Sequence, residues 1–260
     1  MAGRINIGTL ISGGGTNLQA IIDACPDYSP DNSPDSSPDN LIDANIVFTG
    51  SDNPGVRGLE RAQKANIDTF VVDYSNILKS CRENGIKDTD LPKDFDLKDI
   101  LSKQKLFTSG ASPEQTTFFL KSRAIAERQL LDKILSYDMD LLVLAGFMRV
   151  LTPYFIDRIN TEPKHYRIMN IHPALLPSFP GTDGYGDTFA YGCKIGGCTV
   201  HYIDYGEDTG PIIGQKAFEI KDSDTLDDIK KKGLKKEWEL YPQCIQKFAD
   251  YCQASFPKNT

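Results

Sequence analysis

Two polar side chains with catalytic potential stand close together in the segment MNIHPALLP, residues 169–177. The Asn170 amide can donate a hydrogen bond to an oxygen that gains negative charge, and the His172 imidazole can donate or shuttle a proton. On a β-strand, residues two positions apart project from the same face. The alternative is local: both side chains would only satisfy hydrogen bonds in a turn that Pro173 and Pro177 stiffen.

An acidic loop, DYGEDTG, covers Asp204–Gly210 between two stretches rich in β-forming residues. A carboxylate from this loop beside His172 would favour the charged form of the imidazole and keep it protonated. The alternative is a solvated turn whose carboxylates face water.

A glycine-rich loop, SGGGTN, covers Ser12–Asn17 between a predicted strand and a predicted helix. Its backbone N–H groups and the positive end of the helix predict a phosphate site. The alternative is an ordinary tight turn in which Thr16 caps the helix. Asn17 stands where the GxGxxG pattern needs its third glycine, and no lysine follows, so dinucleotide and ATP sites are disfavoured.

Strand and helix patterns alternate along most of the chain. The predicted strands are residues 5–12, 45–49, 67–73, 141–145 and 166–171, and the predicted helices are residues 18–24, 56–65 and 118–137. Continuously apolar strands suit a parallel sheet that is covered on both faces. The order predicts an α/β fold with a doubly wound, mostly parallel sheet, which binds ligands at the carboxyl ends of its strands.

The last third of the chain departs from this alternation. Residues 199–203 and 211–218 are rich in β-forming residues, and we expect them to form an antiparallel pair at one edge of the sheet. A final helix is predicted over Thr225–Cys252, and Pro242 should kink it or split it in two.

Two segments fit no element of the predicted core. Residues 26–40, PDYSPDNSPDSSPDN, are of low complexity, and residues 76–112 are charged and weakly patterned. We interpret both as surface insertions in a single domain that covers residues 1–260.

Composition excludes several classes of protein. The 260 residues carry 29 basic and 36 acidic side chains, a net charge of −7, which argues against nucleic acid or an anionic membrane as a partner. The longest apolar stretch, residues 141–151, is too short to span a bilayer. Without a targeting signal or a CxxC pair, a cytoplasmic chain with free thiols is expected. Cys193 and Cys198 have no nearby ligands, so no metal site is predicted.

Four segments in this order resemble the glycinamide ribonucleotide formyltransferases: ISGGGTNLQAII, VLAGFMRVLTP, MNIHPALLPSFPG and TVHYIDYGEDTGPII. The resemblance covers most of the chain outside the two insertions. It implies a formyltransferase-like variant of the Rossmann fold and transfer of a formyl group from 10-formyltetrahydrofolate to the amine of glycinamide ribonucleotide, without a metal. It leaves a monomer or a homodimer open.

The resemblance also implies roles for individual residues. Asn170 and a protonated His172 would stabilise the oxyanion that forms when the amine attacks the formyl carbon, and Asp208 would favour and orient the protonated His172. The substrate-binding matches are Gly15, Thr16, Asn17 and Glu237. The cofactor-binding matches are Arg123, Met148, Arg149, Val150, Leu151, Asn170, Asp204 and Asp208. A surface position on a charged helix is the alternative for both Arg123 and Glu237.

The sequence departs from the family pattern beyond Gly181, where the family usually has a histidine and this chain reads GTDGYGDTFAYG. This departure leaves loop closure over the cofactor open. The other histidines are His165 and His201, and for His201 we expect a structural role beside the site.

Other functions remain as alternatives. A formyltetrahydrofolate deformylase shares NIHP-type motifs but uses water in place of the amine. Formyltransferases that act on initiator tRNA or amino sugars carry longer C-terminal extensions. A nicotinamide oxidoreductase or a non-catalytic ligand-binding module could use the same fold, but the former lacks its GxGxxG motif here and the latter does not need Asn170, His172 and Asp208 together.

Overall fold

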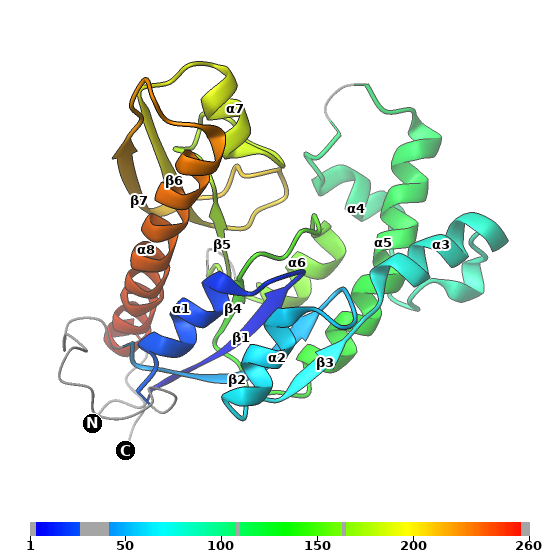
Figure 1. Cartoon of the computed structure of the whole chain (residues 1–260). Coiled ribbons are helices and arrows are strands. Elements are labelled where there is room, and N and C mark those ends of the chain that lie inside the picture. Colours follow the sequence, from blue (N-terminus) through cyan, green and yellow to red (C-terminus); the bar gives the residue numbers. More distant parts are fainter. Residues whose placement is uncertain (1–3, 27–41, 108–109, 163–164, 256–260) are drawn as a thin grey trace.

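The fold is described from a computed structural model, over residues 4–26, 42–107, 110–162 and 165–255 (Figure 1). Within these residues, seven strands form one sheet in the spatial order β3-β2-β1-β4-β5-β6-β7. They are β1 (Ile5–Ile11), β2 (Ala44–Ser51), β3 (Thr69–Val71), β4 (Leu141–Leu144), β5 (Ile168–His172), β6 (Ile195–Tyr202) and β7 (Ile212–Glu219). The strands from β3 to β5 are parallel, and β6 is antiparallel to both β5 and β7. The predicted fold class and antiparallel edge pair are confirmed.

Strand β4 is apolar throughout because both of its faces are covered. In β4, Leu141 and Val143 pack into one hydrophobic core, while Leu142 and Leu144 pack into the other. Successive side chains of a strand point to opposite faces, so a strand between two layers of helices has no polar side.

The helices lie on both sides of the sheet, with α1, α2 and α8 on one core and α3 to α6 on the other (Figure 1). The first group is α1 (Thr16–Ala24), α2 (Arg57–Lys64) and α8 (Leu226–Ser255). The second group is α3 (Tyr74–Asn84), α4 (Leu97–Lys103), α5 (Pro113–Ile134) and α6 (Pro153–Ile159). The short α7 (Gly184–Ala190) packs against α8 near β6.

Helix α8 continues through Pro242, so the predicted split into two helices is wrong. Proline removes one N–H donor from the helix, but tertiary packing holds this turn. The Tyr241 hydroxyl is buried and lies 2.9 Å from the carbonyl oxygen of Leu144 and 3.0 Å from that of Met169. The neighbouring Leu240 and Cys244 are also buried. These contacts fix the helix against the sheet on both sides of the proline.

The structure describes most of the second predicted insertion but almost none of the first. Residues 27–41, which include nearly all of the low-complexity segment, lie outside the described residues. Much of residues 76–112 is helical, which the weak apolar pattern of this segment did not predict. It contains most of α3, all of α4 and a short 3₁₀ turn at Asp88–Asp90, and it buries Cys81 and Ile100.

Local capping explains why these charged stretches form helices. The Asp73 carboxylate accepts the N–H of Asn76 at the start of α3, and the Asp96 carboxylate accepts the N–H groups of Lys98 and Asp99 at the start of α4. Such caps satisfy backbone donors that would otherwise be unpaired, and they stabilise helices with few apolar residues.

Candidate active site

The carboxyl ends of β1, β4 and β5 meet at one edge of the sheet and bring three predicted segments together. Ser12–Asn17 follow β1, Met148–Leu151 follow β4, and β5 ends with His172. The Ser12 hydroxyl oxygen accepts the Met148 N–H at 2.8 Å, so the first two loops touch. A cavity of about 170 Å³ opens here, lined by residues 144, 146–151, 170–173, 181–182, 203–204 and 206–208.

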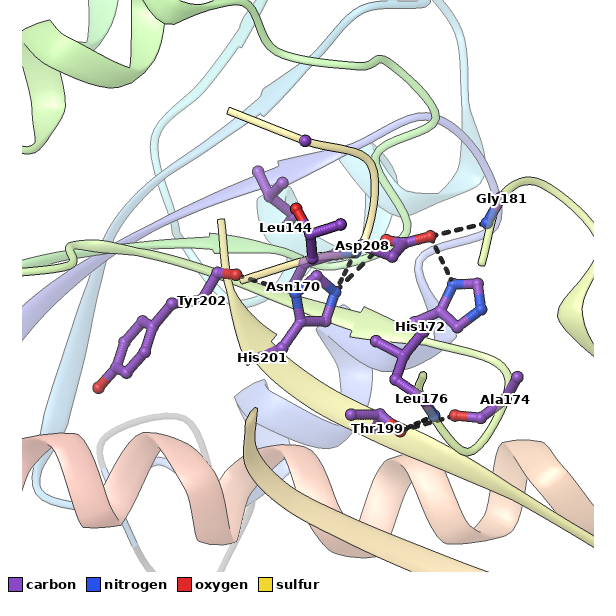
Figure 2. Close-up of polar contacts among 12 residues, drawn as sticks. Leu144, Asn170, His172, Ala174, Leu176, Gly181, Thr199, His201, Tyr202 and Asp208 are labelled. Carbon is purple, nitrogen blue, oxygen red and sulfur yellow. Dashed lines mark hydrogen bonds and ion pairs between the residues drawn. The ribbon is translucent and has the colours of Figure 1, made fainter. Parts of the chain in front are cut away.

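Asn170 and His172 both line this cavity from β5, as the strand interpretation predicts. Two backbone groups of the turn after β5 are satisfied by Thr199 on β6. The buried Thr199 hydroxyl accepts the Leu176 N–H at 3.0 Å and donates to the Ala174 carbonyl at 2.7 Å (Figure 2). The Asn170 amide is therefore not needed to satisfy the turn.

His172 lies between two groups that only accept hydrogen bonds. Its Nδ1 is 3.1 Å from Asp208 Oδ2, and its Nε2 is 2.7 Å from the carbonyl oxygen of Phe179. An imidazole satisfies both contacts only when both ring nitrogens carry hydrogen, which is the charged form. The buried His172 side chain is thus held at both ring nitrogens, by the Asp208 carboxylate on one side and by the Phe179 carbonyl on the other.

A second histidine reaches the same carboxylate (Figure 2). His201 lies opposite Asn170 in the β5–β6 register, and its Nε2 is 3.4 Å from Asp208 Oδ1 and 3.3 Å from the Asn170 amide nitrogen. Its Nδ1 donates to the Tyr202 carbonyl at 2.9 Å. His201 is fully buried and connects two of the predicted catalytic side chains, which agrees with the structural role expected for it.

The Asp208 carboxylate is the centre of this cluster. Burial alone would raise its pKa, but hydrogen bonds from His201 and the Gly181 N–H, and the charges of His172 and His201, outweigh burial and lower the pKa below its ordinary value. The Gly181 N–H donates to Oδ2 at 2.9 Å. Asp208 also adopts a positive φ of 53°, a backbone conformation that side-chain-bearing residues adopt rarely. Its contacts hold the loop in this unusual conformation.

The glycine-rich loop begins α1 without a side-chain cap. Gly15 is the N-cap residue with φ of 68°, and no side chain caps the helix, so the alternative in which Thr16 caps it is wrong. A Cβ at position 15 would lie 2.7 Å from the Gly58 Cα. The loop therefore requires glycine for both its conformation and its close approach to α2.

The loop is tied to α8 through Glu237. The Asn17 amide donates to one Glu237 carboxylate oxygen at 2.7 Å, and the Tyr185 hydroxyl donates to the other at 2.6 Å. Glu237 is only 5% exposed, so the alternative of a solvated helix face is wrong for this residue. Burial and the neighbouring Glu237 charge raise the pKa of Tyr185. The structure thus joins two predicted substrate-binding residues that are 220 positions apart.

A model of the formyl transferase family matches residues 5–245. The chain belongs to the formyl transferase family. A phosphoribosylglycinamide formyltransferase of Bacillus subtilis is 40% identical to it over 126 residues, which are 48% of this chain and 62% of that protein. One from Escherichia coli is 32% identical over 248 residues, which are 95% of this chain and 88% of that protein.

A solved structure agrees with this assignment. The glycinamide ribonucleotide transformylase 1 of Symbiobacterium toebii superposes with a TM-score of 0.66 at 30% identity, over 95% of this chain and 89% of that one. The chain is therefore a formyl-transferring enzyme, and the oxidoreductase and non-catalytic alternatives are disfavoured.

In this formyl transferase, Arg149 attaches the predicted cofactor-binding segment to Asp52 and Tyr74. Arg149 forms an ion pair through its Nε with the buried carboxylate of Asp52, and its guanidinium lies 5.6 Å from the Tyr74 ring centroid. Met148 beside it is 74% exposed. Arg149 lines the cavity with Val150 and Leu151, as does Asp204, whose Oδ1 accepts the Gly206 N–H at 3.0 Å.

The structure does not place Arg123 against the catalytic cavity. Its guanidinium stacks 5.0 Å from the Phe119 ring centroid and 5.8 Å from that of Tyr74, and burial lowers its pKa. It lines a separate cavity of about 540 Å³ between α3, α5 and the segment before α5. Arg123 is half-buried, so the simple surface alternative does not describe it either.

No sequence pattern indicated a role for Glu127, which is hydrogen-bonded to Thr152, the residue directly after the Met148–Leu151 segment. Its side chain is fully buried and accepts the Thr152 N–H at 2.8 Å, with a second contact of 2.5 Å to the Thr152 hydroxyl. Burial raises the pKa of Glu127 to about 7, although hydrogen bonds from Thr152 and the charges of Arg123 and Arg158 act in the opposite direction. In the sequence, Glu127 is one more charged residue of an amphipathic helix, which gives no signal of burial.

Directly after Gly181, Thr182 lines the cavity and Asp183 caps α7 by accepting the Gly186 N–H. Among the described residues, no group of three or more His, Cys, Asp or Glu side chains could hold a metal ion. No helix in the described part of the chain is long and apolar enough to cross a membrane.

Proposed function

We propose that this enzyme transfers the formyl group of 10-formyltetrahydrofolate to the amine of glycinamide ribonucleotide in de novo purine biosynthesis. The observation that carries the proposal is the convergence of Asn170, His172 and Asp208 at a cavity whose neighbouring loop meets the buried Glu237. When bound, the folate supplies the formyl group.

The residues around the cavity suit both ligands. The Met148–Leu151 segment and Asp204 offer backbone and carboxylate groups for the heterocyclic ring of the folate. The loop Ser12–Asn17, at the start of α1, offers N–H groups for a phosphate. Asn17 Oδ1 is buried without a protein partner in the described part of the chain, and it is available as an acceptor for a polar ligand group.

In the proposed reaction, the chain supplies hydrogen-bond donors and position. The Asn170 amide and the charged His172 donate to the formyl oxygen as it gains negative charge, while Asp208 keeps His172 protonated and oriented. To do so, a His172 N–H must exchange the Phe179 carbonyl for the substrate oxygen. The Asn170 amide nitrogen, 3.3 Å from His201 Nε2, must turn its N–H toward the same oxygen. Each such donor is worth about a hundredfold in rate, and holding amine and formyl group together contributes further.

The deformylase alternative uses the same donors, with water as the acceptor of the formyl group in place of the amine. The buried Asn17 Oδ1, which has no partner in the described part of the chain, favours a second substrate with polar groups over water alone.

Formyl release from 10-formyltetrahydrofolate, with and without glycinamide ribonucleotide, tests the proposal. We expect turnover that requires the ribonucleotide and yields its formylated product. Turnover in water alone, unaffected by the ribonucleotide, would support the deformylase instead. A matched fluorescence titration with a folate analogue and with NAD should detect binding of the folate analogue only.

A further inference from the structure

The segment at residues 99–105, within the predicted insertion, contacts the loop that carries Asp208. The Lys105 backbone N–H donates to the Tyr205 carbonyl at 2.9 Å. Lys105 lies two residues beyond the end of α4, and its side chain is exposed. Part of the chain that the family resemblance did not assign to the compact core is therefore hydrogen-bonded to the loop beside the catalytic cavity.

The Tyr205 side chain is held from the same direction. Its hydroxyl donates to Asp157 Oδ1 on α6, and Asp157 Oδ2 accepts the Lys103 ammonium at 2.8 Å. The Lys103 ammonium also contacts Asp99 at 2.7 Å within α4. The Tyr205 ring packs against the core on the α3–α6 side of the sheet. Tyr205 is thus attached through both its backbone and its ring.

The remainder of this loop is attached differently. Asp204 Oδ1 accepts the Gly206 N–H and, at 2.6 Å, the Thr209 hydroxyl, so these residues bond to one another within the loop. Asp208, which has a positive φ, is held by its contacts with His172 and with the Gly181 N–H. Tyr205, three positions before Asp208, is the point where α4 and α6 fix the loop.

We propose that the α4–Lys105 segment positions the Asp204–Asp208 loop for catalysis, with Lys105 and Tyr205 as positioning residues that act through Asp208. The expected effect on kcat rests on the proposed function. The physical attachment of the loop can be tested without any assumption about the substrate.

Lys105→Pro removes the backbone donor, and Lys105→Ala is its matched control because it keeps that donor. Proline fits the preceding backbone, since Gln104 is extended with φ of −66° and ψ of 140°. Tyr205→Phe, which removes only the hydroxyl bond to Asp157, is a second route to the same loosening if the proline variant folds poorly.

Hydrogen–deuterium exchange of the free protein gives the first readout. We expect residues 203–210 to exchange roughly five- to tenfold faster in Lys105→Pro and in Tyr205→Phe, as suits the loss of one hydrogen bond, while Lys105→Ala matches the wild type. Unchanged exchange in both loosened variants would overturn the proposal, whatever the substrate of the enzyme.

Steady-state kinetics give the second readout. We expect kcat to fall roughly five- to tenfold in the two loosened variants, with KM for the amine substrate within about twofold and the melting temperature nearly unchanged. Faster exchange with unchanged kcat would overturn the positioning role. A fall in kcat that Lys105→Ala shows equally would also overturn it, because that variant keeps the hydrogen bond.

Discussion

The buried Glu127 carboxyl should make the free energy of unfolding depend on pH, and Glu127→Gln should abolish this dependence. Burial raises the pKa of this carboxyl from the ordinary 4.5 to about 7. The folded state therefore keeps the proton over a range in which the unfolded state has lost it. The stability from this group is complete below about pH 4.5 and is lost as pH rises through about 7.

The size of the effect follows from the two pKa values. A difference of about 2.5 units, at 1.36 kcal/mol per unit, corresponds to about 3 kcal/mol of unfolding free energy, most of it lost between about pH 5 and pH 7. Glu127→Gln cannot ionise, and its amide keeps an acceptor for the Thr152 N–H. The unfolding free energy of Glu127→Gln should therefore not fall over this pH range.

Urea unfolding followed by circular dichroism, from about pH 5 to pH 8, measures the effect. We expect the wild type to lose roughly 2–3 kcal/mol relative to Glu127→Gln across this range. Glu60→Gln, at an exposed position on α2, is the control and should run parallel to the wild type. Parallel curves for the wild type and Glu127→Gln would refute the assignment of a raised pKa to Glu127.

Three further predictions concern the site. Asp208→Asn keeps the acceptor for the Gly181 N–H but loses the charge that holds His172 protonated, so kcat should fall about a hundredfold with little change in melting temperature; near-wild-type turnover would contradict this role. Gly15→Ala forces an unfavourable φ and a contact with Gly58, and should cost about 1 kcal/mol or more in urea unfolding and raise KM for the ribonucleotide; an unaltered variant would show that the loop tolerates a side chain. Glu237→Gln should raise that KM about tenfold with kcat largely kept, and a selective fall in kcat would argue against a binding role.

The central part of the sheet could be predicted from the sequence because β4 obeys one simple rule. Leu141 to Leu144 are apolar without interruption, and both faces of β4 are buried, as a central parallel strand requires. The same rule placed Asn170 and His172 on one side of β5. Their common orientation follows from spacing alone and needs no knowledge of the partner strands.

Contacts between distant segments could not be predicted in this way. Nothing local to Glu237 or Asn17 indicates that the two side chains meet, since Glu237 lies among lysines on α8. The helices within residues 76–112 depend on caps and on a few buried side chains such as Ile100, which give little apolar periodicity. Pro242 is tolerated in α8 because of Tyr241, whose hydroxyl contacts carbonyls on β4 and β5.

The resemblance to a family added roles that spacing could not give, but it did not fix where each side chain lies. Arg123 matches a cofactor-binding position, yet the structure places it against a neighbouring cavity with Phe119. His201 is joined to Asp208 through a cross-strand position that only the β5–β6 register reveals.

In the proposed reaction, Asn170 stabilises the oxygen that gains charge during formyl transfer. Single-turnover and steady-state rates of Asn170→Ala, compared with the wild type and with the exposed Asn84→Ala as control, test it most directly. We predict that kcat falls about a hundredfold or more, while the dissociation constant of a folate analogue without the formyl group changes less than about tenfold. A kcat within about threefold of the wild type would contradict the account, because such a donor is worth far more than that in a buried site.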